Sequence, residues 1–563
     1  MGIQPKSTQA VATNKMSLYD RGKYNHAPMF NRQLSTINRS SFWVLVGLVG
    51  IAAAVRFPSL FTHSFHADEA LYASYARLIG TGQDMLLRST WVDKPPLLFY
   101  LQSLFYPLMR QPDPFVARLP DFIASILLVP LVARLVRQLY GEGTGRRAAP
   151  SLMNEGEWVG WLAAAFVALS PYTIQFSSTA FLDPLLTFWL VAALVAMSRE
   201  NTLISYEPSP HLRRALSRAT YWAGFLFGLA VVTKFQAGLF LPLVVGIGAL
   251  NGWRGREWRQ WFIGFVPVIL ALLAWELAHR GTLTLWQGQM FSYGGLRLSW
   301  SWELWSRLEQ WGTLWQYTVG SPLLGFGLLL LLPLFLAFLI QEEDRPTYTD
   351  QLFVLFTIAY FLLHWFVAIP VWDRYLLPLV PIIGIILGRF TGRIVGFFGP
   401  ILLPVLYTLT YFRLRQQALR HTIFVLLFLA QLPIAAAAAR STYPIGGHPN
   451  QDDGTAQIAG WLADEPYGTV LYDHWYGWHW RYYLYGQTVY PHWFPDTEAL
   501  LEDLQVFGRQ PEARYLVLPP DPAVGQPVYR TLTEAGYTLT LVGTAVLPDG
   551  QAGASLYRIM TGQ

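Results

Sequence analysis

Long apolar stretches separated by short polar segments run through most of the chain. Eleven such stretches lie between residues 41 and 439. The longer ones reach the length of about 20 residues that a helix needs to cross a hydrocarbon core of about 30 Å. The pattern predicts a polytopic α-helical membrane protein with about eleven spans. The predicted spans are residues 41–61, 116–140, 159–173, 181–197, 221–232, 237–250, 261–278, 323–340, 352–368, 374–387 and 422–439.

Clusters of Lys and Arg predict how these spans are oriented. Basic residues gather in four segments, 1–40, 134–147, 199–218 and 254–259. The alternation of spans places all four on one side of the membrane, and the positive-inside rule makes that side cytoplasmic. The loops 62–115, 174–180 and 279–321 then face outward. A further apolar segment, 395–412, has Arg residues at both ends, so we expect it to be re-entrant or to lie along the membrane surface.

The two ends of the chain differ from the membrane part. Residues 1–40 are polar and lack the apolar core and cleavage site of a secretory signal, so we expect a disordered cytoplasmic tail. Residues 440–563 are rich in Gly, Pro, Asp, Tyr and Trp. A helix-like segment, 456–465, is followed there by four strand-like segments, 469–473, 513–520, 537–546 and 555–559. We therefore expect a small α/β domain. The odd number of spans places this domain outside the cytoplasm.

The composition agrees with a membrane protein. Of the 563 residues, 53% are hydrophobic and only 13% are charged, whereas soluble proteins carry about 25% charged residues. The absence of Cys excludes disulfides and thiolate chemistry. The net charge of +5 is spread over the loops, where membrane topology explains it better than nucleic acid binding does.

An acidic pair follows the first predicted span, in the sequence "HADEALYASYA". Asp68 and Glu69 stand on the outer side, where a short helix starting near Ala67 would display them beside Tyr72 and Tyr75. Acids in a first helical turn also complement the helix dipole, and taken alone the pair is explained by that role.

Two further ionisable residues lie in outward loops. Lys94 precedes Pro95 and Pro96, which stiffen the chain and present the lysine outside a helix. It could be an interfacial lysine that reaches toward water, or a ligand for a phosphate. Asp183 stands before Pro184 at the outer end of the fourth span, where capping of a helix is an equal alternative. Three outer loops therefore each deliver a charged group to the membrane surface.

These residues belong to motifs that resemble a known family. The motifs "ADEALYASYARLIGTGQDMLLR", "DKPPLLFYL", "FVARLPDF", "FLDPLLTFWL", "VVTKFQAGL" and "WDRYLLPLVPIIGI" occur in that order within residues 42–390. Their order and spacing resemble the GT-C integral-membrane glycosyltransferases. The most similar group is glycosyltransferase family 39, which contains protein mannosyltransferases and aminoarabinose transferases.

The resemblance implies roles for individual residues. The first Asp of the family's Asp-Glu pair is regarded as the catalytic acid or base and corresponds to Asp68, with Glu69 beside it as a further candidate catalytic residue. The family's Lys before Pro-Pro contacts the donor phosphate and corresponds to Lys94. The Asp of the Leu-Asp-Pro motif corresponds to Asp183, a secondary acid of the candidate catalytic site. The resemblance also implies a polyprenyl-phosphate sugar donor and catalysis on the extracytoplasmic face. We expect a location in the bacterial plasma membrane.

The chemistry of such a transfer agrees with these residue types. A carboxylate must accept the proton of the acceptor hydroxyl or amine, and cations must hold the charge that grows on the departing phosphate. Lys94 is our first candidate for the phosphate, followed by Arg88, Arg118 and Arg374. Each of these arginines has an alternative role in interfacial anchoring or helix packing.

The chain departs from the family in two motifs. Asp93 stands where close relatives often have Glu, a position that some of them use near a metal. We therefore expect no certain cofactor, leave a divalent metal open and name no metal ligands. The chain reads "TKFQAG" where relatives commonly show Thr-Lys-Gly, so no role is assigned to Lys234.

Two aromatic regions carry weaker signals. The segment 281–320 is rich in Trp, Ser and Tyr, and an interfacial aromatic belt explains it better than a cover over the site or an acceptor-binding loop. His474, His479 and His492 have spacings of five and thirteen that fit no standard zinc pattern. A packed aromatic core or a surface resting on the membrane explains them better than sugar binding.

The leading hypothesis is a membrane glycosyltransferase that acts on a lipid, protein or polysaccharide acceptor. The alternative is a lipid-linked-sugar transporter or flippase without covalent chemistry, but transporters place their ionisable groups near the midplane, often in inverted repeats. A glycan-binding module anchored by the spans is a third reading. It is disfavoured because an anchor needs one helix.

Overall fold

The computed structural model describes residues 39–108, 113–141, 155–198, 210–280, 285, 287–288, 297–320, 322–341, 344–405, 412–446, 451–508 and 510–561. The predicted tail lies almost wholly outside these residues. The chain divides into two compact units, Met1–Val44 and Leu45–Gln563. The second unit contains both the helices and the sheet that are described below.

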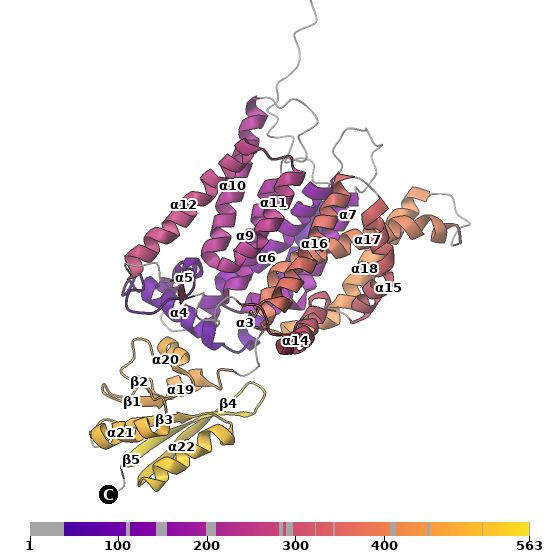
Figure 1. Ribbon diagram of the computed structural model, residues 1–563. Coiled ribbons are helices and arrows are strands. Elements are labelled where there is room, and N and C mark those ends of the chain that lie inside the picture. The colour runs from indigo at the N-terminus through magenta and orange to yellow at the C-terminus, as the bar shows by residue number, and fades with distance from the viewer. Residues whose placement is uncertain are drawn as a thin grey trace, which may run out of the picture. The chain divides into compact units, whose positions relative to one another are not determined.

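The second unit is helical up to Ala439 apart from its connecting loops (Figure 1). Helix α6 packs against α7 and α9, α10 packs against α9 and α12, and α17 packs against α7. The helices, after α2 (Arg39–Arg56), are α3 (Ser59–Thr62), α4 (Ala67–Gly80), α5 (Leu97–Ser103), η1 (Tyr106–Leu108), α6 (Pro114–Tyr140), α7 (Glu155–Leu169), α8 (Pro171–Gln175), η2 (Phe176–Ser178), α9 (Leu182–Met197), α10 (Pro210–Thr233), η4 (Phe235–Phe240), α11 (Leu241–Leu250), α12 (Gly255–Arg280), α14 (Ser301–Val319), α15 (Pro322–Gln341), α16 (Arg345–Phe366), η5 (Asp373–Leu379), α17 (Val380–Val405) and α18 (Phe412–Ala439).

Several of these helices are long and apolar enough to cross a membrane. Six meet that condition within the described residues, or seven if the α7–α8 pair, bent by 55°, is one span. Three shorter apolar helices cover Leu182–Met197, Phe235–Leu250 and Leu330–Ile340. A helix lies at each predicted span, but the number eleven stays a prediction. The chain is therefore a multi-pass integral membrane protein.

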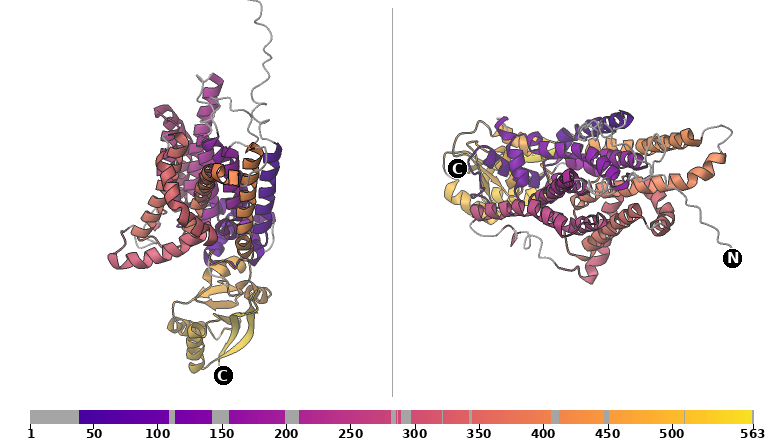
Figure 2. Two further views of the ribbon diagram at one scale, coloured as in Figure 1. Left: turned by 90° about the vertical axis from the view of Figure 1, so that its right-hand side faces the viewer. Right: turned by 90° about the horizontal axis from the view of Figure 1, so that it is seen from above.

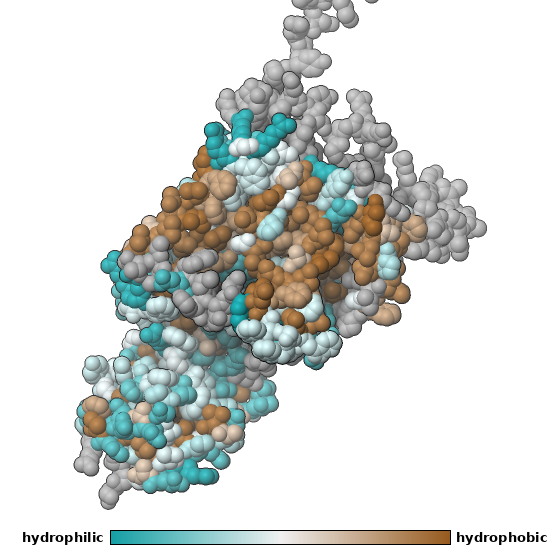
Figure 3. Space-filling view, viewed as in Figure 1, coloured by the Kyte–Doolittle hydropathy of each residue, from teal (hydrophilic) through white to brown (hydrophobic). Residues whose placement is uncertain are grey.

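Apolar side chains cover the outside of the helices. Figure 3 shows a hydrophobic band across the helical part, with hydrophilic residues at its two ends. On α12 the exposed residues of this band include Phe262, Val266 and Leu270. Exposed apolar side chains in such number are stable only against lipid, so the band marks the membrane-facing surface.

The predicted end of one span is wrong. We expected the tenth span to stop at Leu387, but α17 continues to Val405. The basic residue that indicated a loop, Arg389, is instead buried and pairs with Asp350 of α16 at 3.0 Å. Residues 395–405 of the segment 395–412 therefore belong to α17, residues 406–411 lie outside the described residues, and Phe412 begins α18.

The aromatic segment before α15 contains a helix that does not qualify as a span. Helix α14 lies across the ends of the upright helices (Figure 2, left), and Trp300, Trp302 and Trp305 at its start are exposed. Indole rings favour the boundary between lipid and water. The arrangement agrees with the interfacial aromatic belt that we favoured.

The C-terminal part is an α/β domain, as predicted. Its sheet has the strand order β2-β1-β3-β5-β4, in which β2, β1 and β3 run parallel while β5 is antiparallel to β3 and β4. The strands are β1 (Val470–Asp473), β2 (Tyr490–Trp493), β3 (Arg514–Leu518), β4 (Tyr537–Val546) and β5 (Ala552–Thr561), and the helices are α19 (Thr455–Trp461), α20 (Gly477–Tyr483), α21 (Thr497–Phe507) and α22 (Pro522–Glu534).

Helix α4 packs against this domain as well as against the membrane helices. Its residues Ala70, Ala73 and Ala76 share one buried cluster with Trp480 and Tyr482 of α20. His479 Nε2 lies 2.7 Å from the Phe65 carbonyl oxygen, just before α4. Small alanines allow the two helices to approach closely. The domain therefore supports the helix that begins with the acidic pair.

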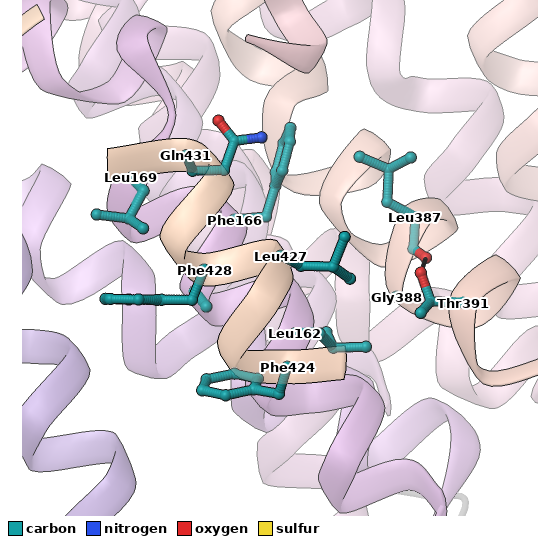
Figure 4. A pocket seen from close by; sticks show the side chains of 11 residues that line it. Leu162, Phe166, Leu169, Leu387, Gly388, Thr391, Phe424, Leu427, Phe428 and Gln431 are labelled. Atoms are coloured by element: carbon teal, nitrogen blue, oxygen red, sulfur yellow. Dashed lines mark hydrogen bonds between the residues drawn. The ribbon is translucent and has the colours of Figure 1, made fainter. Parts of the chain in front are cut away.

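An apolar pocket lies between α7, α17 and α18 (Figure 4). Leu162, Phe166, Phe424 and Phe428 line it, and Gln431 is one of its few polar residues. No candidate site residue from the sequence lies on its wall. The pocket is therefore not the candidate active site.

Candidate active site

The N-terminus of α4 is fixed by its own side chains. His66 caps the helix, since its Nδ1 accepts a hydrogen bond from the Asp68 N–H at 2.9 Å. The His66 N–H in turn donates to Glu69 Oε1 at 3.2 Å. This reciprocal capping box starts the helix at Ala67 and satisfies donors that the first turn would otherwise leave free. The short helix expected near Ala67 is confirmed.

Asp68 forms an ion pair with a residue far along the chain. Its Oδ2 lies 2.9 Å from an N–H nitrogen of Arg374, and the Asp68 side chain keeps 34% of its surface exposed. Burial alone would raise the pKa of Asp68, but Arg374, aided by His66 and Lys94, outweighs burial and holds that pKa below its ordinary value. Asp68 is therefore an ionised carboxylate that solvent can reach.

The Arg374 guanidinium is held between aromatic rings. It lies 4.3 Å from the centroid of the Trp372 ring and 4.7 Å from that of Phe181. Phe181 immediately precedes α9, while Arg374 belongs to the 3-10 helix η5 that leads into α17. Stacking of this kind fixes the plane of a guanidinium and leaves its edge to bind anions.

Lys94 reaches the same region from the first outer loop. Its Nζ lies 2.6 Å from Asp93 Oδ2, and the residue is buried in a non-helical stretch before α5. Its positive charge is close enough to contribute to the lowered pKa of Asp68. Lys94 therefore lies within electrostatic range of Asp68.

Asp183 is part of a second ion pair beside the first. Its Oδ1 lies 2.6 Å from Nζ of Lys234, and the carboxylate is almost fully buried. Lys234 stands in the break between α10 and η4, outside the predicted spans, and its Nζ lies 4.4 Å from the Tyr375 ring centroid. Burial lowers the pKa of Lys234 to about 8.

Glu69 differs from Asp68 in its surroundings. It is fully buried, and its Oε2 accepts hydrogen bonds from Arg118 Nε at 3.0 Å and from the Ala180 N–H at 2.8 Å. These contacts join α4, α6 and the segment before α9. The geometry favours a positioning role for Glu69 over the catalytic role that we expected.

Arg118 likewise uses its N–H groups in hydrogen bonds within the protein. Besides Glu69 it donates to the backbone carbonyls of Leu60, His63 and Ser64, at 2.9, 3.2 and 3.0 Å. A second bond to Glu69, at 3.5 Å, uses its last N–H. No donor remains for a phosphate, so we leave Arg118 out of the proposed phosphate site.

We expect Arg118→Ala to lower the free energy of unfolding by about 3 to 5 kcal/mol, because it leaves the buried Glu69 carboxylate without its partner. Unfolding of the purified protein by denaturant, compared with the exposed control Arg530→Gln, measures the effect. A variant with wild-type stability and lost transfer would instead make Arg118 a phosphate ligand.

Arg88 does not join the other candidates. Its Nε donates to the Ala278 carbonyl at the end of α12, at 2.8 Å, and the residue is exposed.

Of the predicted residues, the structure thus brings together Asp68, Lys94, Arg374 and Asp183, with Glu69 and Arg118 behind them. Among the described residues, no group of three or more His, Asp or Glu side chains is arranged to hold a metal ion.

Two residues near the site were not predicted. Lys234 received no role because its motif departs from the family pattern, although a lysine between two apolar stretches is itself a signal. Asp121 of α6 is fully buried near Asp183 and Glu69, and neither of its oxygens has a hydrogen-bond partner within the described part of the chain. Only the fold could place Asp121 there.

The three histidines near the C-terminus have separate partners. His479 contacts the Phe65 carbonyl, the His474 Nδ1 lies 2.8 Å from the Phe494 carbonyl, and His492 packs on Tyr472. Burial lowers the pKa of His479 to about 4, so this ring is neutral at physiological pH and serves packing.

Part of this chain matches a known protein family in sequence, and most of the chain resembles solved structures in fold. Residues 93–277 match the family described as dolichyl-phosphate-mannose-protein mannosyltransferase. ArnT from Cupriavidus metallidurans, solved in the apo state, has 16% sequence identity and a TM-score of 0.59, over 92% of this chain and 98% of its own. The same protein bound to undecaprenyl phosphate has 17% identity and a TM-score of 0.56, over the same shares of 92% and 98%.

A second kind of enzyme shares the fold. The oligosaccharyltransferase of Archaeoglobus fulgidus, tethered to an acceptor peptide, has 13% identity and a TM-score of 0.51, over 91% of this chain and 74% of its own. No curated protein matches the chain by sequence. A third of the chain therefore resembles a mannosyltransferase family in sequence, and most of the chain shares the fold of these membrane proteins.

Proposed function

We propose that this protein moves a sugar from a polyprenyl-phosphate donor to an acceptor at the extracytoplasmic face of the membrane. One observation carries the proposal. The Asp68 carboxylate, which solvent can reach, lies against Arg374 and within electrostatic range of Lys94. A carboxylate beside cations, at the outer ends of membrane helices, is the arrangement that transfer from a lipid phosphate needs.

The proposed step uses these groups in separate roles. The acceptor oxygen or nitrogen attacks the anomeric carbon of the donor sugar, and its proton passes to the Asp68 carboxylate. The bond between the anomeric carbon and the phosphate oxygen breaks, and the electron pair leaves on the polyprenyl phosphate. Lys94 and Arg374 bind the oxygens on which this charge grows. Arg374 then exchanges its bond to Asp68 for one to phosphate.

The second ion pair supports the same site. Asp183 compensates the charge of Lys234, whose ammonium otherwise would add to those of Lys94 and Arg374 in a buried region. We propose that the Asp183–Lys234 pair sets the electrostatic potential around the donor phosphate and does not itself transfer a proton.

The chemical class of the donor rests on the related structures. ArnT was solved with undecaprenyl phosphate, and the archaeal oligosaccharyltransferase with dolichol phosphate. Both are isoprenoid phosphates, and the cations described here suit the same head group. The extracytoplasmic location rests on the distribution of basic residues, which places the loop that carries Asp68 and Lys94 outside.

Reconstituted vesicles test the reaction. The full-length protein receives a polyprenyl-phosphate sugar together with a cell-envelope lipid extract. We expect free polyprenyl phosphate and a new glycoside to form together, as measured by mass spectrometry. If the intact donor only crosses the bilayer, the protein is a flippase and the proposal fails. Comparison of envelope glycans with and without the gene then identifies the sugar and the acceptor.

The rate of transfer should fall as the pH rises above about 8, the lowered pKa of Lys234. Below that pH Lys234 is charged and compensates Asp183. Above it the lysine loses its proton, which leaves the Asp183 carboxylate buried without a counterion. A pH profile of kcat/KM measures this decline. Lys234→Arg should move it to higher pH, because Arg stays charged. An unchanged decline in that variant would contradict the assignment.

A further inference from the structure

A second group of charged and aromatic residues lies on the outer side, away from the reacting carboxylate. Arg280, the last residue of α12, donates a hydrogen bond to the Thr90 carbonyl. Arg481 of α20 lies 3.4 Å from the hydroxyl of the same Thr90. Two guanidinium groups, from a membrane helix and from the C-terminal domain, therefore meet at one residue of the first outer loop.

Each of these arginines lies over a tryptophan. The Arg280 guanidinium carbon is 5.6 Å from the centroid of the Trp91 ring, and that of Arg481 is 5.3 Å from the Trp478 ring. Trp91 and Trp478 nevertheless keep 59% and 41% of their surface exposed. We call Thr90, Trp91, Arg280, Trp478 and Arg481 the cationic rim.

The two arginines of the rim are held by neutral groups in the part of the chain that the structure describes. Within the described part of the chain, neither Arg280 nor Arg481 forms a salt bridge. The nearby carboxylate, Asp93, pairs with Lys94. The Nε of Arg280 is buried and has no hydrogen-bond partner among the described residues. Guanidinium groups held by neutral atoms keep donors for an external anion.

The rim is connected to the active site through α4. The Tyr75 hydroxyl donates to the Trp91 carbonyl at 2.5 Å, and Tyr75 follows Asp68 by two turns of the helix, about 10 Å along its axis. A short saccharide spans that distance. A chain whose end reaches Asp68 would therefore lay its next rings along the rim.

We infer that the cationic rim is an acceptor subsite that binds an anionic saccharide, with its carboxylate or phosphate on Arg280 and Arg481 and its rings against Trp91 and Trp478. This inference rests on the proposed function, because it names the class of acceptor for that reaction. Aromatic faces suit the apolar faces of sugar rings, and guanidinium groups suit planar anions. Trp478 belongs to the C-terminal domain and not to a membrane helix, so a saccharide explains its exposed ring better than a phospholipid head group does.

Binding to the purified full-length protein tests the inference without any transfer. Isothermal titration calorimetry compares an oligogalacturonate with a neutral malto-oligosaccharide of the same length. We expect the wild-type protein to prefer the anionic chain. Arg481→Gln and Trp478→Ala should each weaken its binding about tenfold, while Arg481→Lys should retain most of it. Each tenfold loss corresponds to about 1.4 kcal/mol.

Two exposed residues of the same domain provide matched controls. Arg530→Gln removes an exposed guanidinium and Tyr467→Ala an exposed ring outside the rim, and both should bind like the wild type. Equal binding of both saccharides, or unchanged binding by Arg481→Gln and Trp478→Ala, would overturn the inference. So would variants that lose only their binding to phosphatidylglycerol vesicles, since the anion would then be a lipid.

The inference and the proposed function fail separately. If the wild-type protein transfers sugar while rim variants bind the anionic chain normally, only the acceptor subsite is wrong. If rim-dependent binding is found but the wild-type protein forms no glycoside from any donor, the transfer reaction is wrong, and the rim is a saccharide-binding site but not an acceptor subsite.

Discussion

Asp68→Asn should reduce transfer by about 10²- to 10⁴-fold, because an amide cannot accept the proton of the acceptor and general base catalysis contributes about that much. The change keeps the size of the side chain, and the amide nitrogen no longer attracts Arg374. We therefore expect membrane insertion and the thermal unfolding midpoint to stay near wild type. The rate of glycoside formation in vesicles measures the loss.

Asp464→Asn provides the matched control for this variant. Asp464 is exposed on the C-terminal domain and lies outside the site, so its replacement should leave the rate unchanged. Transfer by Asp68→Asn at the wild-type rate would remove Asp68 from the mechanism. Two neighbouring carboxylates, Glu69 and Asp183, are already paired with Arg118 and Lys234.

Lys94→Ala should reduce kcat by about 10²- to 10³-fold, the range found when a group that stabilises transition-state charge is removed. Lys94→Arg should recover part of this, since it restores the charge with a different donor geometry. The loss should appear in kcat more than in KM, because the phosphate carries its largest charge as the sugar departs.

A second variant separates charge from local structure. Lys94→Ala leaves Asp93 beside the site without its partner at 2.6 Å, and this carboxylate would repel the phosphate. Asp93→Asn combined with Lys94→Ala removes both charges. If the double variant recovers full activity, Lys94 serves only to neutralise Asp93 and is no phosphate ligand.

The membrane fold could be predicted from local patterns because apolar length is a strong signal in lipid. Apolar length failed to predict the end of a helix where a charged residue is buried. Arg389 indicated a loop, yet the fold buries it against Asp350, so α17 runs on past the predicted end. In the C-terminal domain four strands were predicted from their β-branched and aromatic residues. The short strand β2, with Pro and His in it, carried too little of that pattern.

Part of the candidate site could also be predicted from local patterns in the sequence. Asp68, Lys94 and Asp183 stand beside recognisable local features, an acidic pair or a proline. Which of two adjacent acids faces solvent is a tertiary property, and the sequence assigned Asp68 and Glu69 similar roles. For Arg118 the sequence left helix packing as an alternative to phosphate binding, because its partners, the carbonyls of residues 60, 63 and 64, become neighbours only when α3 packs against α6. Asp121 carried no local signal at all.

The packing of α4 against α20 has a consequence for biosynthesis. The membrane helices are complete once the ribosome passes Ala439, but the helix that begins with Asp68 still lacks the partner that buries Ala70, Ala73 and Ala76. A polypeptide released at that stage would have its membrane helices, but the segment that carries Asp68 would lack these contacts. The surface of α4 that receives α20 is therefore covered only after residues 477–483 have been translated.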